Sequence, residues 1–218
     1  GGHVDIPLEN VYAAWAQMKE LGKKPVPPGH QGWKIMWQDV QVVSDAALLN
    51  GSGGNDDTNY IRVNTKKCEG NAVVAFTVNE VVYWSWHIWV TDYNPDNPVE
   101  QREVNGRMWM DRNLGAMANK YTDDGAARGL LYQWGRKDPF PGAKGWTDGA
   151  KTVYSGYDSP NNPTKSSFNY AILDSHNNGG IYQNLPYSIQ HPDEYLYVTS
   201  DNRDWYSDDP SIKNDTLW

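Results

Sequence analysis

The stretch that most constrains the fold of this chain is the run VVYWSWHIWVT at residues 81–91. Read with a period of two, one face is apolar without a break and consists of Val82, Trp84, Trp86, Ile88 and Val90. The opposite face is mixed and carries Val81, Tyr83, Ser85, His87, Trp89 and Thr91. β-Branched and aromatic residues in this alternation are typical of a strand with one buried face and one partly covered face. We therefore expect a strand that lies centrally in an antiparallel sheet.

The residues before this run predict one helix and several short strands. An amphipathic helix is expected over residues 6–21, because apolar side chains recur there at three- and four-residue spacing: Leu8, Val11, Tyr12, Trp15 and Met18. Apolar and β-branched segments predict strands at residues 33–37, 39–43, 60–64 and 72–78. Asn79-Glu80 is typical of a tight hairpin turn. The pattern indicates a mainly β chain with minor α, in which the N-terminal helix accompanies a small antiparallel β-sandwich.

A loop dense in turn-forming residues at 92–98 divides the chain into a predicted first domain at 1–98 and a second at 99–218. Regular periodicity almost vanishes beyond this loop, and residues 141–215 are rich in Gly, Asn, Asp, Ser and Pro. Aromatic residues are too frequent there for disorder, whose signature is their scarcity. We expect long ordered loops that are anchored by aromatic side chains.

Three blocks carry a resemblance to a known family. They are WSWHIWVTDYNP at 84–95, MDRNLGA at 110–116 and LLYQWGRKDPFPG at 130–142. Together they resemble the C-terminal region of fimbrillin-like surface proteins of Bacteroidetes. The second half also resembles the FISUMP (major paralogous) domain, whose relatives have a C-type-lectin-like fold. The resemblance is strongest over residues 70–140, and it implies a loop-rich, C-type-lectin-like domain at 99–218.

The resemblance implies a non-enzymatic component of the cell surface or of fimbriae, with a role in cell adhesion. It implies an extracellular location, associated with the outer membrane, and other surface or pilus proteins as partners. In such proteins a further segment follows the position of Trp218. We therefore expect the second domain to be incomplete at this end, less stable than in a longer chain, and prone to pair with itself through its second half.

An alternative interpretation is a carbohydrate-binding module that displays loop aromatics to host or dietary glycans. Aromatic rings combine apolar faces with polar edges, and polar loops can present them for stacking. The candidate ligand-binding residues are Trp146, Tyr154, Tyr157, Trp205 and Tyr206. Solvent exposure of these rings would favour sugar binding, whereas burial would leave them a structural role. A glycoside hydrolase would need two facing carboxylates, which the sequence cannot place.

Charge and composition exclude other classes. The net charge of −8 argues against nucleic acid as a partner, because a row of phosphates would find nothing to neutralise it. No apolar run approaches the roughly twenty residues that a membrane-spanning helix needs. Cys68 is the single cysteine, which excludes an intramolecular disulfide, and we expect it to be chemically incidental.

Metal and catalytic sites have weak signals. The loops at 55–59 and 201–209 offer hard oxygen ligands of the kind that calcium takes, although neither follows the EF-hand pattern. Solvated turn acids are the default, and the better calcium candidates are Asp201, Asp204, Asp208 and Asp209. No other cofactor is predicted.

No enzyme is predicted either, because the chain has no Gly-x-Ser-x-Gly elbow and its histidines lack metal-ligand spacing. His87 is predicted to be a core or interface histidine bonded to a neighbour. Asp111 and Asp138 lie beside Arg112 and Arg136, which favours internal ion pairs that fix loops over acid–base chemistry.

Overall fold

The computed structural model describes residues 1–38, 42–51, 58–120, 126–140, 169–172, 181–197 and 205–206. Over these residues the chain is mainly β, with two α-helices and short 3-10 turns, so the predicted fold class is confirmed. Neither described helix combines the length and the apolar character needed to cross a membrane.

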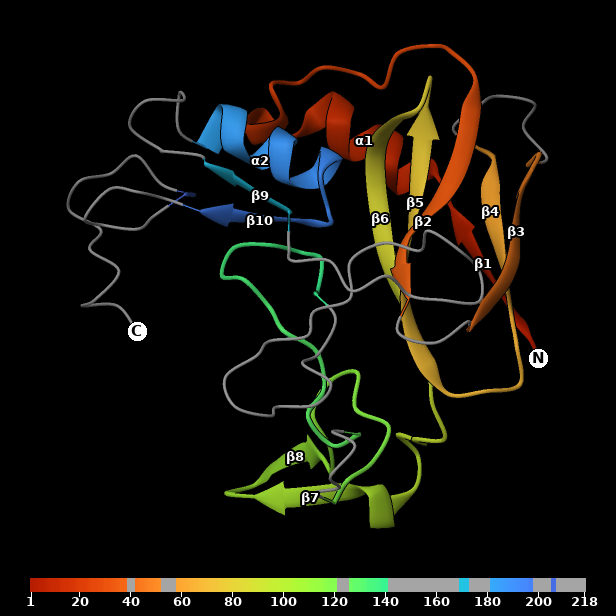
Figure 1. The fold of residues 1–218 in the computed structure, drawn as a ribbon, viewed down its shortest axis with the longest axis vertical. Helices are drawn as coiled ribbons and strands as arrows, with labels where there is room; N and C mark the ends of the chain where they lie inside the picture. Colours follow the sequence, from red (N-terminus) through yellow and green to blue (C-terminus); the bar gives the residue numbers. More distant parts are fainter. Residues whose placement is uncertain are drawn as a thin grey trace.

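Two three-stranded antiparallel sheets form the body of the molecule (Figure 1). One has the order β1-β4-β3 and is built from β1 (His3–Pro7), β3 (Val43–Leu49) and β4 (Tyr60–Thr65). The other has the order β2-β5-β6 and is built from β2 (Gln31–Gln38), β5 (Gly70–Val78) and β6 (Val81–Val90). The strands predicted from residue 60 onward are thus confirmed within two residues. Of the strand predicted at 39–43, residues 39–41 lie outside the described part of the chain, and β3 begins at Val43.

The predicted strand at 81–91 exists as β6, but its predicted central position is wrong. Among the described strands β6 lies at the edge of its sheet and β5 lies in the middle. Every residue of β5 is buried, whereas β6 has buried and half-buried positions. The small Ala and Val side chains of β5 can be covered from both faces, while the large rings of β6 retain a partly wet side.

The outer edge of β6 is covered by side chains instead of another described strand. The indole Nε1 of Trp15 donates to the carbonyl oxygen of Tyr83 at 2.7 Å. Further along, Nζ of Lys137 donates to the carbonyl oxygen of Ser85 at 2.9 Å. An uncovered edge invites pairing with another chain, so these two donors protect the first half of the strand.

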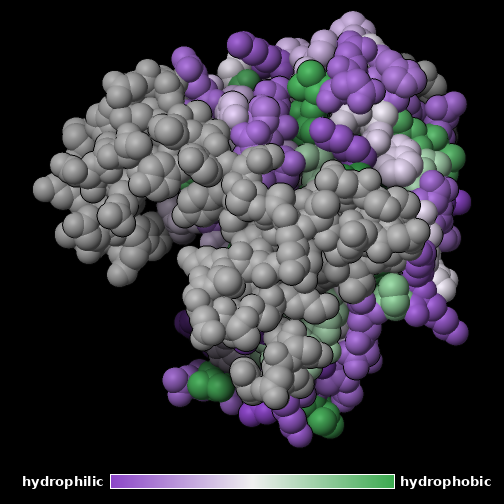
Figure 2. Space-filling model, in the orientation of Figure 1, coloured by the Kyte–Doolittle hydropathy of each residue, from purple (hydrophilic) through white to green (hydrophobic). Residues whose placement is uncertain are grey.

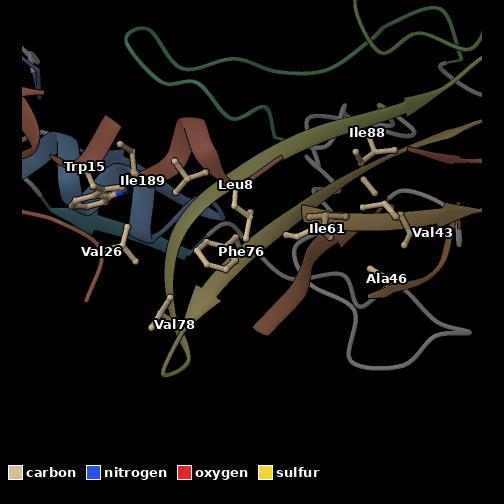
Figure 3. Close-up of a cluster of buried hydrophobic side chains, with 14 of the residues drawn as sticks. Leu8, Trp15, Val26, Val43, Ala46, Ile61, Phe76, Val78, Ile88 and Ile189 are labelled. Carbon is tan, nitrogen blue, oxygen red and sulfur yellow. The ribbon is translucent and has the colours of Figure 1, made fainter. Parts of the chain in front are cut away.

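One hydrophobic core is shared by both sheets and both helices (Figure 3). Its fully buried members include Leu8 before the first helix, Ile61 on β4 and Phe76 on β5. Burying one such side chain contributes about 1.5–3 kcal/mol relative to leaving it exposed. Ile189, from near the other end of the chain, is 3 % exposed in the same core.

The predicted N-terminal helix is shorter than expected. Residues 3–7 form β1, which pairs with β4 along its whole length, and only then does α1 (Glu9–Gln17) begin. The backbone is extended at Met18, after which a 3-10 turn at Lys19–Leu21 ends the segment. Strand pairing of the first residues has therefore overridden their helical periodicity. The second helix, α2 (Ile181–Gln190), contacts the 3-10 turn that follows α1 and also contacts β6 (Figure 1).

The second face of the β2-β5-β6 sheet has a smaller core of its own. Val73 and Ala75 of β5 pack there with Met36, Trp37 and Val82, and Leu130 covers the cluster. The indole Nε1 of Trp37 donates to the carbonyl oxygen of Pro139 at 3.1 Å. Residues 130–140 thus form the lid of this face.

Two further strand pairs complete the described structure. The hairpin of β7 (Gln101–Val104) and β8 (Arg107–Met110) lies at the end of the molecule away from the helices (Figure 1). A short parallel pair joins β9 (Asn169–Ile172) to β10 (Glu194–Tyr197). Because α2 contributes to the core of the first sheets, residues of the predicted second domain pack on the first. The division at residue 98 stays a prediction.

The β5–β6 turn generates a test of the fold. Asn79 and Glu80 have φ values of +49° and +66°, which is the backbone of a type I′ turn. Glu80→Gly removes the Cβ that makes this conformation costly, and we expect the variant to be more stable by about 0.5–1 kcal/mol. Thermal unfolding should show a melting temperature higher by about 2–4 °C.

The matched control is Glu80→Ala, which removes the same charge but keeps a Cβ. It should show no gain. Equal melting temperatures for the glycine and alanine variants would contradict the strained-turn explanation.

Candidate functional site

The hairpin of β7 and β8 is the first part of the candidate site. Asn105 and Gly106 connect the strands, and both have positive φ values, +53° and +72°. The turn is again of type I′, for which Asn-Gly is the preferred pair. This hairpin was not predicted from the sequence, although Asn105-Gly106 is a sufficient signal for one.

Exposed apolar side chains are concentrated in the stretch of chain that contains this hairpin. Of the thirteen large hydrophobic side chains that are exposed in the described residues, nine lie between 99 and 134: Val99, Val104, Met108, Trp109, Met110, Leu114, Leu131, Tyr132 and Trp134. In Figure 2, apolar atoms stand among polar ones at the end of the molecule where β7 and β8 lie. Such a concentration is typical of an interaction surface.

Arg112 anchors the base of the hairpin. Its Nε donates to Oδ1 of Asp111 at 2.8 Å, and its Nη1 donates to Oδ1 of Asp92 at 2.7 Å. The side chains of Arg112 and Asp111 are 6 % and 2 % exposed, whereas that of Asp92 is 73 % exposed. The other oxygen of Asp111 accepts a hydrogen bond from Nδ2 of Asn119 at 2.7 Å. The predicted ion pair between Asp111 and Arg112 is confirmed.

Aromatic rings hold the same guanidinium in place. Arg112 lies over the ring of Tyr93 at 5.3 Å, and Tyr93 stacks on Trp89 with 6.1 Å between centroids and an interplanar angle of 9°. Because Trp89 belongs to β6, Arg112 joins the end of that strand to the residues after β8. Arg112 lowers the pKa of both Asp111 and Asp92, so all three groups stay charged near neutral pH.

A cleft of about 440 Å³ lies beside this anchor, and its size is that of a small-ligand site. Its lining combines an exposed indole, paired charges and amides: Trp109, Met110, Asp111, Arg112, Asn113, Leu114, Ala118, Asn119 and Ala127. Nδ2 of Asn113 donates to the carbonyl oxygens of Ala127 and Arg128. Nδ2 of Asn119 donates to Asp111. The NH2 groups of both amides therefore donate to acceptors of the protein. Their side-chain carbonyl oxygens take no part in these described bonds.

A second polar cluster lies at the edge of β6. Nζ of Lys137 donates to Oγ of Ser85 at 2.6 Å and to both carboxylate oxygens of Asp138 at 2.8 Å, and Oγ of Ser85 donates to Oδ1 of Asp138 at 2.8 Å. The serine hydroxyl beside a lysine resembles a nucleophile with its base. Here, however, the lysine donates to a carboxylate, and Ser85 is 3 % exposed. The cluster attaches the loop that contains Lys137 and Asp138 to strand β6.

The ion pair predicted for Asp138 is present, but Arg136 is not the partner; Lys137 is. Arg136 lies over the ring of Phe140 at 5.1 Å and donates instead to backbone carbonyls at and beyond the end of α2, those of Ser188, His191 and Glu194. A cation at the carboxyl end of a helix satisfies the carbonyl groups that the helix leaves without partners. Burial lowers the pKa of Arg136 to about 10, which leaves it charged at neutral pH.

His87 is bonded to a neighbour, as predicted. Its Nε2 lies 2.9 Å from Oδ1 of Asn71, and Nδ2 of Asn71 donates to the carbonyl oxygen of Gly115 at 2.9 Å. The second bond fixes the orientation of the Asn71 amide, so the neutral ring of His87 carries its proton on Nε2. Burial lowers the pKa of His87 to about 4.

Of the predicted ligand-binding aromatics, the structure describes two. Trp205 is 3 % exposed, and its Nε1 donates to the carbonyl oxygen of Trp134 at 2.9 Å. Tyr206 packs edge-on against Trp205 at 5.7 Å. In this position the indole of Trp205 packs inside the protein and presents no open face to a sugar. Trp146, Tyr154 and Tyr157 lie outside the described residues.

The calcium candidates Asp201, Asp204, Asp208 and Asp209 also lie outside the described residues. Within the part of the chain that the structure describes, no group of three or more His, Cys, Asp and Glu side chains is placed to hold a metal ion. The calcium prediction therefore stays a prediction.

Comparison of the chain with family models, with curated proteins and with solved structures finds no match.

The low pKa of His87 predicts a loss of stability in mild acid. In the unfolded chain the imidazole protonates near pH 6.5, whereas in the fold it resists protonation down to about pH 4. Between these values the unfolded state binds more protons, so stability falls as the pH falls. From pH 7 to pH 5 the contribution lost is about 2 kcal/mol.

His87→Gln keeps a donor for Asn71 and cannot titrate. Urea unfolding at pH 7 and pH 5 should show a smaller pH-dependent loss for this variant than for the wild type. His30→Gln, at an exposed position, serves as the control and should retain the full loss. A His87→Gln variant with the pH dependence of the wild type would sink the explanation.

The cluster at the edge of β6 predicts a strong effect of one substitution. Lys137→Met leaves the carboxylate of Asp138, 3 % exposed, without its cation. The expected loss in the free energy of unfolding is about 3 kcal/mol, measured by urea denaturation. Because the penalty comes from the unpaired charge, the double variant Lys137→Met/Asp138→Asn should recover at least half of that loss.

An exposed lysine provides the control. Lys67→Met should change the free energy of unfolding by less than about 0.5 kcal/mol. If the double variant were as unstable as Lys137→Met alone, the loss would come from packing and the charge explanation would be wrong.

Proposed function

We propose that this chain is a non-enzymatic binding component of a bacterial cell surface or of a fimbria, which acts in adhesion or assembly from an extracellular position. The observation that carries the proposal is the concentration of exposed apolar side chains on β7–β8 and the residues around it. The resemblance of three blocks to fimbrillin-like surface proteins points in the same direction.

The separation of this surface from the core supports a binding role. The hairpin is four residues long on each strand, and all four residues of β8 are exposed. Such a hairpin is marginal on its own, and here the buried pair of Arg112 and Asp111 holds its base. Exposed Trp109 and Met108 at 58 % each are residue types enriched in interfaces.

The described polar clusters favour binding over catalysis. The arrangement most similar to a catalytic one, Ser85 with Lys137, is engaged with Asp138 and shielded from solvent. A nucleophile must reach its substrate, and Ser85, which carries this hydroxyl, is 3 % exposed. A carbohydrate-binding module is the second candidate function, because the cleft beside Trp109 combines an indole with amides.

The test uses the organism that encodes the chain. A tagged wild-type chain should be recovered with surface appendages that are sheared from intact cells. The double variant Val104→Lys/Met108→Lys places charges on both faces of the hairpin, where the native side chains are 53 % and 58 % exposed. We expect its recovery in the sheared fraction to fall about tenfold at an unchanged cellular level.

The matched control is Val4→Lys/Met18→Lys, which charges two side chains that are each 40 % exposed elsewhere. It should behave as the wild type does. Wild-type protein confined to the cell interior, or equal recovery of the two double variants, would refute the proposal.

A further inference from the structure

The cleft beside the hairpin has a chemistry of its own. We propose that it binds a neutral saccharide unit, with the indole of Trp109 as the stacking wall and the amides of Asn113 and Asn119 as hydrogen-bonding groups. This site lies outside the loop aromatics considered in the sequence analysis. The inference rests on the proposed binding function and names the ligand class that this surface takes.

Charge pairing makes the ligand neutral. The cleft contains one guanidinium, that of Arg112, and it is already engaged by the carboxylates of Asp111 and Asp92. Both oxygens of Asp111 accept hydrogen bonds, from Arg112 and from Asn119. An anionic ligand would compete with two carboxylates for one cation, and a cationic ligand would compete with the guanidinium for the carboxylates. A neutral polar ligand needs neither exchange.

The amides supply the polar part of recognition. Asn113 and Asn119 donate their NH2 groups to protein acceptors, to the carbonyl oxygens of Ala127 and Arg128 in one case and to Asp111 in the other. These internal bonds orient each amide, and each carbonyl oxygen has two acceptor positions. Hydroxyl groups of a sugar are donors that match such acceptors.

Trp109 supplies the apolar part. Its ring is 58 % exposed while it lines the cleft, so a flat face is accessible to a ligand before binding. It lies on β8, whose base is fixed by the buried pair of Asp111 and Arg112. A rigidly held aromatic ring loses little conformational entropy when a ligand stacks on it. The sequence spacing of Trp109, Asn113 and Asn119 places all three within one short segment.

The experiment begins with a glycan array probed by the whole chain. Neutral oligosaccharides built on glucose, galactose, mannose and N-acetylglucosamine are printed beside sialylated and sulfated glycans. We expect binding to neutral glycans. For the best of these, titration calorimetry should show that Trp109→Ala weakens binding about tenfold, whereas Trp109→Phe retains most of the affinity.

Trp134→Ala is the matched control, because Trp134 is a tryptophan of similar exposure, 61 %, and is not among the residues that line the cleft. Its affinity should stay within about twofold of the wild type. Thermal unfolding of all three variants identifies any loss that is due to misfolding. In that case Asn119→Asp, which adds an unpaired charge to the cleft, provides an independent test and should also weaken binding.

The outcomes separate this inference from the proposed function. No binding to any neutral glycan, by a chain that is still recovered with surface appendages, overturns the saccharide site and leaves the surface role standing. Preference for sialylated or sulfated glycans overturns the charge argument. Equal effects of Trp109→Ala and Trp134→Ala place the sugar elsewhere. A loss of surface recovery in Trp109→Ala without any glycan binding would identify the cleft as a protein interface and would also overturn the inference.

Discussion

The burial of β5 on both faces is the constraint on which the rest of the described structure depends. A strand covered on both sides needs two layers of partners. One layer is the large core, in which Phe76 packs with residues of both helices and of the other sheet. The other layer is the small core around Val73, which Leu130 covers. The central strand therefore requires a segment from the second half of the chain.

That segment is residues 130–140, and its hydrogen bonds connect it to β2, β6, β10 and α2. Leu130 covers the second face of the sheet, and Gln133 bonds both the N–H and the carbonyl oxygen of Leu196 in β10. Arg136 satisfies the end of α2, and Lys137 with Asp138 covers the edge of β6. Most of these bonds join a side chain to a backbone group that has no hydrogen-bond partner within a strand pair or a helix. Such bonds let an irregular segment satisfy polar groups that would otherwise be buried without a partner.

The sequence predicted where strands lie along the chain better than which strands lie next to each other in a sheet. Alternation identified β6, and the turn residues Asn79-Glu80 joined it correctly to β5. The edge position of β6 was missed because the period of a strand shows which faces are buried and says nothing of which strand lies beside it. Ile6 and Pro7 were predicted as the start of the helix, and their pairing with β4 depends on contacts with residues more than fifty positions away.

The candidate site shows the same division. The local pair of Asp111 and Arg112 followed from adjacency in the sequence, while Asp92, which completes it, is twenty residues distant and was not predicted. Asp138 likewise had two cations beside it, and sequence alone favoured Arg136. The structure shows why Lys137 prevails: the guanidinium is drawn to three carbonyls around the end of α2, which leaves the ammonium for the carboxylate. The planar guanidinium of Arg136 spans carbonyls of three separate residues, whereas the compact ammonium of Lys137 bonds Ser85 and both carboxylate oxygens of Asp138.

Charged groups are engaged by protein partners both in the interior and at the base of the candidate recognition surface. Around residues 130–140, Arg136 and Lys137 bond backbone carbonyls and Lys137 pairs with Asp138, while at the base of the hairpin Arg112 pairs with Asp111 and Asp92. The cleft beside the hairpin offers a ligand the indole of Trp109 and the amide oxygens of Asn113 and Asn119. Selectivity within the cleft then comes from shape and from hydrogen bonds that form only after contact. Because the Arg112 anchor is largely buried and the hairpin beyond it is exposed, substitutions in the hairpin can alter recognition while the core that positions it stays intact.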